Sequence, residues 1–362
     1  MSSVISVHPR LLRLGPVAVP VNVRLVVVSV AVAALCLVVA CLSIAYGEFP
    51  LPVIDVLRVL GGGGTRVEQT VVFDLRMGRV VVALVVGASL AYAGALTQSV
   101  ARNALASPDI LGITDGASLA AAAAIVFTGA GTGGVIAAGA DSVLATVGIP
   151  GIAILGALVT GVVIWLLAGG GRTTMLQMVL IGVGAAIFLA GLRTWLLAYA
   201  ELDRAIEARM WLTGSLNGRD FNHAWVPLLV LLLAVALAGY LAFQLAALAL
   251  GDVTAHVLGH HVTAAQASQL LTAVVLSAVA VSAAGPVPFI AFVAPQIARW
   301  AGGTPTPPLL FSALTGALLL SFSDLMARVI LPWELPVGVF TAFVGAPVLL
   351  VLILRQTRKE TV

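Results

Sequence analysis

Long apolar runs separated by short polar segments form the main pattern of this 362-residue chain. Most runs hold roughly 20 residues, the length that an α-helix needs to cross a bilayer core about 30 Å thick. We therefore expect an all-α, polytopic membrane protein. The runs predict ten spanning helices, at residues 25–46, 78–100, 109–129, 146–168, 174–199, 225–243, 265–284, 287–300, 309–330 and 336–355.

The same pattern predicts the domain organisation. Residues 25–355 form a single transmembrane domain, between a basic tail at 1–24 and a short tail at 356–362. Hydrophobic residues make up 61% of the chain and charged residues 9%, whereas a soluble domain carries about 25% charged residues. This composition excludes an ordinary soluble domain. We expect the helices to contact membrane lipid and the chain to bind no nucleic acid.

Charged residues are unevenly divided between the two ends of the predicted helices. If both termini lie in the cytoplasm, the cytoplasmic segments hold nine basic and three acidic residues, and the opposite segments hold nine basic and eleven acidic ones. Basic residues that flank a span favour the cytoplasmic side. The distribution therefore predicts cytoplasmic N- and C-termini.

Five motifs follow one another along the chain. The first, Leu75–Ser118, is an apolar run rich in small residues that closes with the polar pair Arg102–Asn103 and continues into a turn. The others are MWLTGSL from Met210, LGDVTAHVLG from Leu250, AGPVPFIAFVAPQIARW from Ala284 and ELPVGVFTAFVGAPVLLVLILR from Glu334. Together they resemble the FecCD family, the permease subunits of bacterial ABC importers for iron–siderophore complexes, haem and vitamin B12. Ala104 stands where the family has proline, and Gln296 where it has histidine.

The resemblance implies the type II ABC importer permease fold, built from two related halves. It implies that the protein carries a ferric siderophore across the bacterial cytoplasmic (inner) membrane, with vitamin B12 or haem as the alternative cargo. The implied partners are a dimer of ATPase subunits, a second permease subunit and an extracytoplasmic substrate-binding protein. We favour a heterodimer of two different permeases, and a homodimer stays open.

The resemblance assigns docking of the binding protein to Arg76, Arg79 and Arg328, because family members carry arginines there that pair with its glutamates. A guanidinium forms two parallel hydrogen bonds with a carboxylate and stays charged at physiological pH. The alternative is that these arginines only anchor helix ends, with their charged groups extended to the polar interface.

The resemblance also places functional residues at the cytoplasmic ends of the helices. Asn103 and Leu105 belong to a cytoplasmic gate, or else to an ordinary turn capped by Asn103. Met175 and Leu176 form a second gate, with an alignment that is loose by one or two residues. A segment of short helices contacts the ATPase, with glycines for its tight turns and Asp252 as a helix cap. Its members are Leu250, Gly251, Asp252, Ala255, Leu258 and Gly259.

No motif of a catalytic site stands out. The phosphate-binding pattern G-x-x-x-x-G-K-[ST] is missing from the sequence, so we expect a transport subunit without its own ATPase site and without a cofactor. His256 and His260 have the spacing of a metal-binding pair, but no third ligand is apparent, and we expect no metal. An ion-driven secondary transporter is the alternative class. Asp115 is its only candidate for an acidic residue within the membrane.

Overall fold

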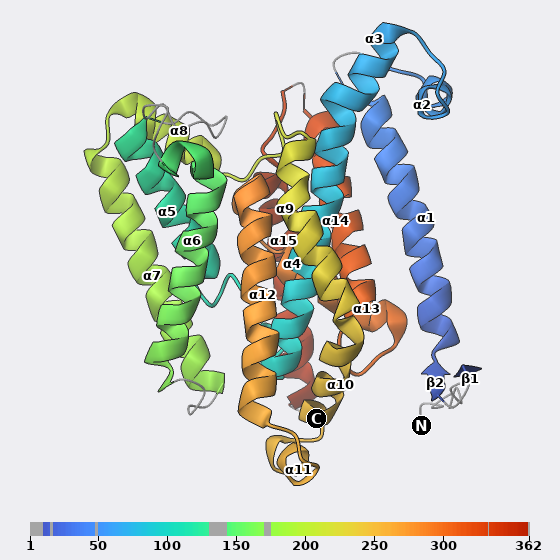
Figure 1. The fold of residues 1–362 in the computed structure, drawn as a ribbon, viewed down its shortest axis with the longest axis vertical. Coiled ribbons are helices and arrows are strands. Elements are labelled where there is room, and N and C mark those ends of the chain that lie inside the picture. The colour runs from blue at the N-terminus through green and yellow to red at the C-terminus, as the bar shows by residue number, and fades with distance from the viewer. Residues whose placement is uncertain are drawn as a thin grey trace.

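The computed structural model describes residues 10–14, 17–47, 50–129, 143–169, 175–331 and 333–360. A short antiparallel hairpin precedes a bundle of helices that run along the long axis of the molecule (Figure 1). The elements are β1 (Arg10–Leu14), β2 (Val17–Val21), α1 (Val23–Ala45), α2 (Val53–Leu60), α3 (Arg66–Gln69), the π-helical segment η1 (Thr70–Met77), α4 (Gly78–Ala101), α5 (Ile113–Thr128), α6 (Val143–Leu167), α7 (Met175–Tyr199), α8 (Leu202–Leu212), α9 (Phe221–Ala236), α10 (Ala238–Ala249), α11 (Asp252–Val257), α12 (Val262–Ala284), α13 (Ile290–Gly302), α14 (Leu309–Val329) and α15 (Val337–Glu360).

The two ends of the bundle carry different short elements. Helices α2, α3 and α8 lie at one end, and α11 lies at the other end together with β1 and β2 (Figure 1). We call these the α8 end and the α11 end. They correspond to the non-cytoplasmic and cytoplasmic sides of the predicted topology.

Each predicted spanning helix has a counterpart in the structure, with two differences. The expected helix at 225–243 is the pair α9 and α10, bent by 58° at Leu237. The expected helix at 109–129 begins only at Ile113, because residues 102–112 form a turn. Among the described residues, six helices are long and apolar enough to span a membrane, or seven with the bent pair.

Helix α4 lies at the centre of one group of helices and packs on α12, α13 and α14. Its small residues make this possible, as the sequence indicated. A Cβ added at Gly87 would lie 2.3 Å from the Gly316 carbonyl oxygen, and one at Gly94 would lie 1.7 Å from the Ala291 carbonyl oxygen. Close backbone contact is the usual way in which membrane helices gain packing energy, since lipid is as apolar as their side chains.

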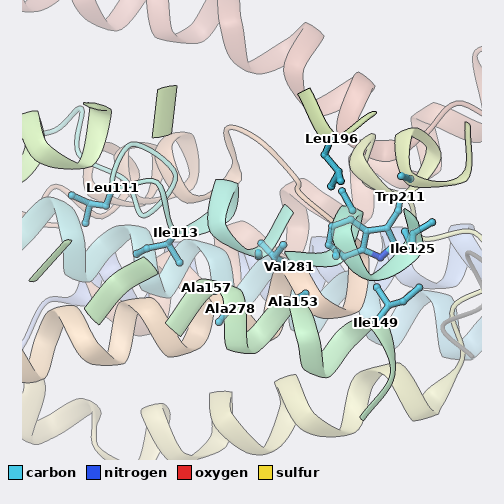
Figure 2. Packing of buried hydrophobic residues seen from close by; sticks show 14 of the residues in the cluster. Leu111, Ile113, Ile125, Ile149, Ala153, Ala157, Leu196, Trp211, Ala278 and Val281 are labelled. Atoms are coloured by element: carbon cyan, nitrogen blue, oxygen red, sulfur yellow. The ribbon is translucent and has the colours of Figure 1, made fainter. Parts of the chain in front are cut away.

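A second group consists of α5, α6, α7 and α8. Its apolar cluster includes Ile125, Trp211 and Ile149, and reaches Ala278 and Val281 of α12 (Figure 2). The cluster joins the second group to the first, because α12 contacts α4, α5 and α6.

Helices α1 and α7 bury few of their apolar residues. Val30 and Leu37 of α1 are 65% and 69% exposed, and Ile187 and Phe188 of α7 are 69% and 65% exposed. An apolar helix with this exposure needs lipid or another subunit around it. The structure thus fits a chain embedded in a membrane.

Candidate functional site

The turn after α4 contains two of the predicted gate residues. Arg102 ends α4 in a left-handed conformation with φ of 49°. The Asn103 side chain accepts a hydrogen bond from the Leu105 amide at 2.9 Å, which closes a local turn. Leu105 packs against the cluster around Phe292 of α13. The structure therefore holds this turn against a second helix, and we call residues 102–112 the gate turn.

A buried pair of glutamines fastens the gate turn to α13. Gln98 donates to the Phe292 carbonyl at 3.0 Å. Gln296 donates to the Gln98 side-chain oxygen at 2.6 Å and to the Ala104 carbonyl at 3.4 Å. Buried amides are costly unless they are paired, so these bonds fix one position of the turn. This role was not predicted from the sequence, although a glutamine in each of two apolar helices was a usable signal.

The Arg102 guanidinium connects the gate turn to residues 250–259, which we call the coupling segment. It donates to the Leu248 carbonyl at 2.8 Å and forms an ion pair with Asp252. The predicted capping role of Asp252 is wrong, because Gly251 occupies the cap position of α11 and the Asp252 carboxylate pairs with Arg102 instead. The two predicted functional regions are therefore in direct contact.

The coupling segment forms the tip of the α11 end (Figure 1). Gly251 and Gly259 have φ of 101° and 85°, a region that glycine enters freely and other residues do not. Ala255 is buried, while apolar side chains around it are exposed, namely Leu250, Val253, Val257 and Leu258. An exposed apolar tip of this kind is typical of a protein contact.

Two further predictions concern residues near this end. Met175 and Leu176 begin α7, but their side chains lie outside the described residues, so their gate role stays a prediction. The His260 ring lies 5.3 Å from that of Phe243, measured between centroids. Within the described parts of the chain, no group of three or more His, Cys, Asp or Glu side chains could hold a metal ion.

At the α8 end, two of the predicted docking arginines bind a buried aspartate. Arg79 donates to both carboxylate oxygens of Asp324, at 2.9 and 3.1 Å to one and 3.2 Å to the other, and to Glu334 at 3.1 Å. Arg328 pairs with Asp324 at 3.1 Å and donates to the Tyr46 carbonyl at 3.2 Å. The exposed fractions of these side chains are 12% for Arg79, 8% for Arg328 and 1% for Asp324. We call these four charged residues the arginine cluster.

The third docking arginine also contacts the protein itself. Arg76 donates to the carbonyls of Ile44 and Ala45 at 2.6 and 3.1 Å. Arg76 and the arginine cluster therefore tie α1, α4 and α14 together at the α8 end. The docking role of the three arginines stays a prediction, and these contacts show that each also holds helices in place. The arginines exposed at this end include Arg58 and Arg66.

A polar hollow of about 860 Å³ opens between the two groups of helices. Asp115 of α5 and Arg193 of α7 form an ion pair at 3.2 Å on its wall, and each side chain is 25% exposed. Arg209 of α8 lines this hollow and a neighbouring one of about 470 Å³. Asp115 was a candidate from the sequence, but its partner Arg193, 78 residues away, was not.

Three of the sequence motifs meet at the edge of the polar hollow. Gly214, from MWLTGSL, accepts a hydrogen bond from the Gly338 amide at 3.0 Å. A Cβ at Gly338 would lie 2.1 Å from the Thr213 carbonyl oxygen, and one at Gly285 would lie 2.6 Å from the Trp211 carbonyl oxygen. Only glycine permits this approach of backbones, which explains why these motifs share it.

Comparison with known proteins gives consistent matches over nearly the whole chain. Residues 35–355 match the FecCD transport family. The chain is 35% identical over 341 residues to the ferric enterobactin transport system permease protein FepG of Escherichia coli (strain K12), an alignment covering 94% of this chain and 99% of that protein. It is 34% identical over 328 residues to the iron(3+)-hydroxamate import system permease protein FhuG of Bacillus subtilis (strain 168), covering 89% and 94%.

The fold is also found among solved structures. A metal-chelate type ABC transporter in an inward-facing conformation aligns with a TM-score of 0.78, over 91% of this chain and 99% of that chain, at 24% sequence identity. This match concerns the fold, and it agrees with the predicted all-α permease architecture.

Proposed function

Because the chain belongs to the FecCD transport family, we propose that it is the permease subunit of an ABC importer that carries a ferric siderophore across the bacterial cytoplasmic membrane. The main support for this proposal is that permeases of ferric enterobactin and iron(3+)-hydroxamate systems align along 94% and 89% of this chain. Those names favour an iron chelate over vitamin B12 or haem. The energy for transport comes from a separate ATPase, since the sequence has no phosphate-binding loop.

We place the α11 end in the cytoplasm. The distribution of basic residues supports this orientation, and so does the exposed apolar tip of the coupling segment, which offers a surface for the ATPase dimer. The extracytoplasmic binding protein then docks at the α8 end. A second permease completes the assembly, and a heterodimer is supported by similar identity, 35% and 36%, to FepG and FepD of one ferric enterobactin system.

Transport requires the ATPase to move the gate. The Arg102–Asp252 ion pair joins the gate turn directly to the coupling segment, and the Arg102 bond to the Leu248 carbonyl joins it to the end of α10. A displacement of α11 by the ATPase therefore reaches the gate turn without an intervening helix. The Gln98–Gln296 pair fixes the resting position of the gate turn, from which the turn moves during transport.

The coupling segment gives a test of the contact with the ATPase. Replacing Gly251 and Gly259 together by valine should strain both turns, by about 1–3 kcal/mol for each residue forced into positive φ. We expect the double variant to reach the membrane and to lose most of its co-purifying ATPase. The control is Gly239→Val, because Gly239 is exposed, its φ is not positive and an added Cβ would meet no atom within 4 Å.

The readouts are the amount of ATPase recovered with the tagged permease and the ATP hydrolysis stimulated by loaded binding protein. Wild-type recovery with intact stimulated hydrolysis in the Gly251→Val/Gly259→Val variant would show that the coupling segment is an ordinary surface loop.

A further inference from the structure

The polar hollow carries more hydrogen-bond donors than the protein itself uses. Arg193 donates to Asp115 through one of its two terminal nitrogens. In the part of the chain that the structure describes, its remaining N–H groups have no protein acceptor, and Arg209 has none at all. Ser118 also lines the hollow and is only 1% exposed, and its hydroxyl has no hydrogen-bond partner among the described residues. Buried polar groups are rarely left unpaired, so the Ser118 hydroxyl requires an explanation, and the two guanidinium groups keep N–H groups available to a ligand.

The charges of the hollow indicate what would satisfy them. Its lining holds two arginines and one aspartate, an excess of positive charge beside apolar helices, where unpaired charge is costly. Guanidinium groups bind oxygen anions through parallel, charge-assisted hydrogen bonds. The complementary ligand is therefore anionic and presents several oxygens on its surface.

Arg209 occupies a position that a moving ligand would pass. It is exposed, and it lines both the polar hollow and the neighbouring hollow, which Glu334 of the arginine cluster also lines. Thr213 lines both spaces as well. The two hollows share a wall, and a ligand arriving from the α8 end would meet Arg209 before it reaches Arg193.

We propose that Arg193, Arg209 and Ser118 form an anion-binding wall on the path of the cargo, and that this wall selects ferric chelates with a net negative charge. This inference rests on the proposed function. A ferric tris-catecholate fits the site, because the charges of its catecholate oxygens outweigh that of Fe³⁺. The Asp115 carboxylate accepts one hydrogen bond from the Arg193 guanidinium. This lowers the affinity of the wall for the cargo and allows the cargo to dissociate.

The same ion pair has a purely structural reading, in which Asp115 and Arg193 only join α5 to α7. The two interpretations predict different effects of substituting Asp115. If the pair is structural, removing either partner breaks the same contact and has the same effect. If the wall binds anions, Arg193→Gln weakens the hold on the cargo, whereas Asp115→Asn frees the guanidinium and does not.

The test uses the complete importer in proteoliposomes, with binding protein loaded with a radiolabelled ferric tris-catecholate. We expect the maximal uptake rate of Arg193→Gln/Arg209→Gln to fall on the order of tenfold, the loss of about 1.4 kcal/mol of binding to the moving cargo. The binding-protein concentration for half-maximal uptake should not change. Arg193→Lys should retain most of the rate, because it keeps the charge, and Asp115→Asn should not reproduce the loss. The control is Arg66→Gln, an exposed arginine at the α8 end that does not line either hollow.

Three results would overturn the proposal while leaving the proposed function intact. The first is wild-type uptake by the double glutamine variant. The second is an equal loss in Asp115→Asn and Arg193→Gln. The third is a loss of assembled complex that matches the loss of uptake, which would mark the wall as a contact between subunits. If the wild-type importer itself moves no ferric chelate with ATP, both the proposed function and this inference fail.

Discussion

Changing Arg79 to glutamate is expected to lower the amount of folded protein in the membrane to a small fraction of that of wild type. Arg66→Glu should leave this amount unchanged. Asp324 is 1% exposed and is held by Arg79 and Arg328. A glutamate at position 79 would bring a third carboxylate beside Asp324 and Glu334. Breaking a buried ion pair costs about 3–5 kcal/mol, because a charge is left without compensation. Like-charge repulsion adds to that cost.

The measurement is the yield of monodisperse protein after detergent extraction, followed by its melting temperature. Arg79→Lys should fall between wild type and Arg79→Glu, because lysine keeps the charge but cannot bind both carboxylate oxygens in the planar geometry of arginine. Full yield and an unchanged melting temperature for Arg79→Glu would show that the arginine cluster does not hold the helices together.

This expectation changes how docking must be tested. Loss of uptake in Arg79→Glu or Arg328→Glu does not by itself report lost docking, since both residues also join helices. Docking must be measured as the affinity of purified binding protein for the permease. The measurement should use only variants whose folded yield equals that of wild type.

Breaking the Arg102–Asp252 pair by a charge reversal at either residue should uncouple ATP hydrolysis from uptake. The side chains of Arg102 and Asp252 are 47% and 54% exposed, so the pair contributes only about 0.2–1 kcal/mol to stability. Its importance lies in its position, because it links the gate turn to the coupling segment. We expect Arg102→Asp and Asp252→Arg, each alone, to lower uptake on the order of tenfold, a typical coupling between two sites. ATP hydrolysis should persist in both.

The double variant Arg102→Asp/Asp252→Arg serves as the matched control. It restores an ion pair of opposite polarity, and aspartate tolerates the left-handed conformation that residue 102 adopts. Uptake per ATP hydrolysed should therefore recover in the double variant. If it stays as low as in the single variants, the pair does not transmit movement and the link between gate and coupling segment is incidental.

Most of the long helices were accessible to sequence analysis because they are apolar runs of spanning length. The short helices at the α8 end were not, since segments such as α8 are polar and stay outside any search for spans. The bend at Leu237 was also missed, because no proline marks it. The pattern of apolar residues shows which residues are buried in the membrane or the protein, but not where a helix bends.

Some of the functional residues could also be predicted from the sequence, and others could not. The tight turns at Gly251 and Gly259 were predicted through the family resemblance of LGDVTAHVLG, and both glycines have positive φ. The partners of the charged residues were not. Arg79 and Asp324 are 245 residues apart, and Arg102 and Asp252 are 150 apart. Their pairing depends on how the helices pack, which one sequence does not reveal.

We propose that this chain forms the membrane path of an ATP-driven importer for a ferric siderophore. The most direct measurement is uptake of a radiolabelled ferric siderophore into proteoliposomes that contain the chain, its second permease and the ATPase, with binding protein outside and ATP inside. This function predicts uptake that requires both ATP and the binding protein and that does not depend on ion gradients. Uptake that follows an ion gradient without ATP and is lost in Asp115→Asn would contradict it.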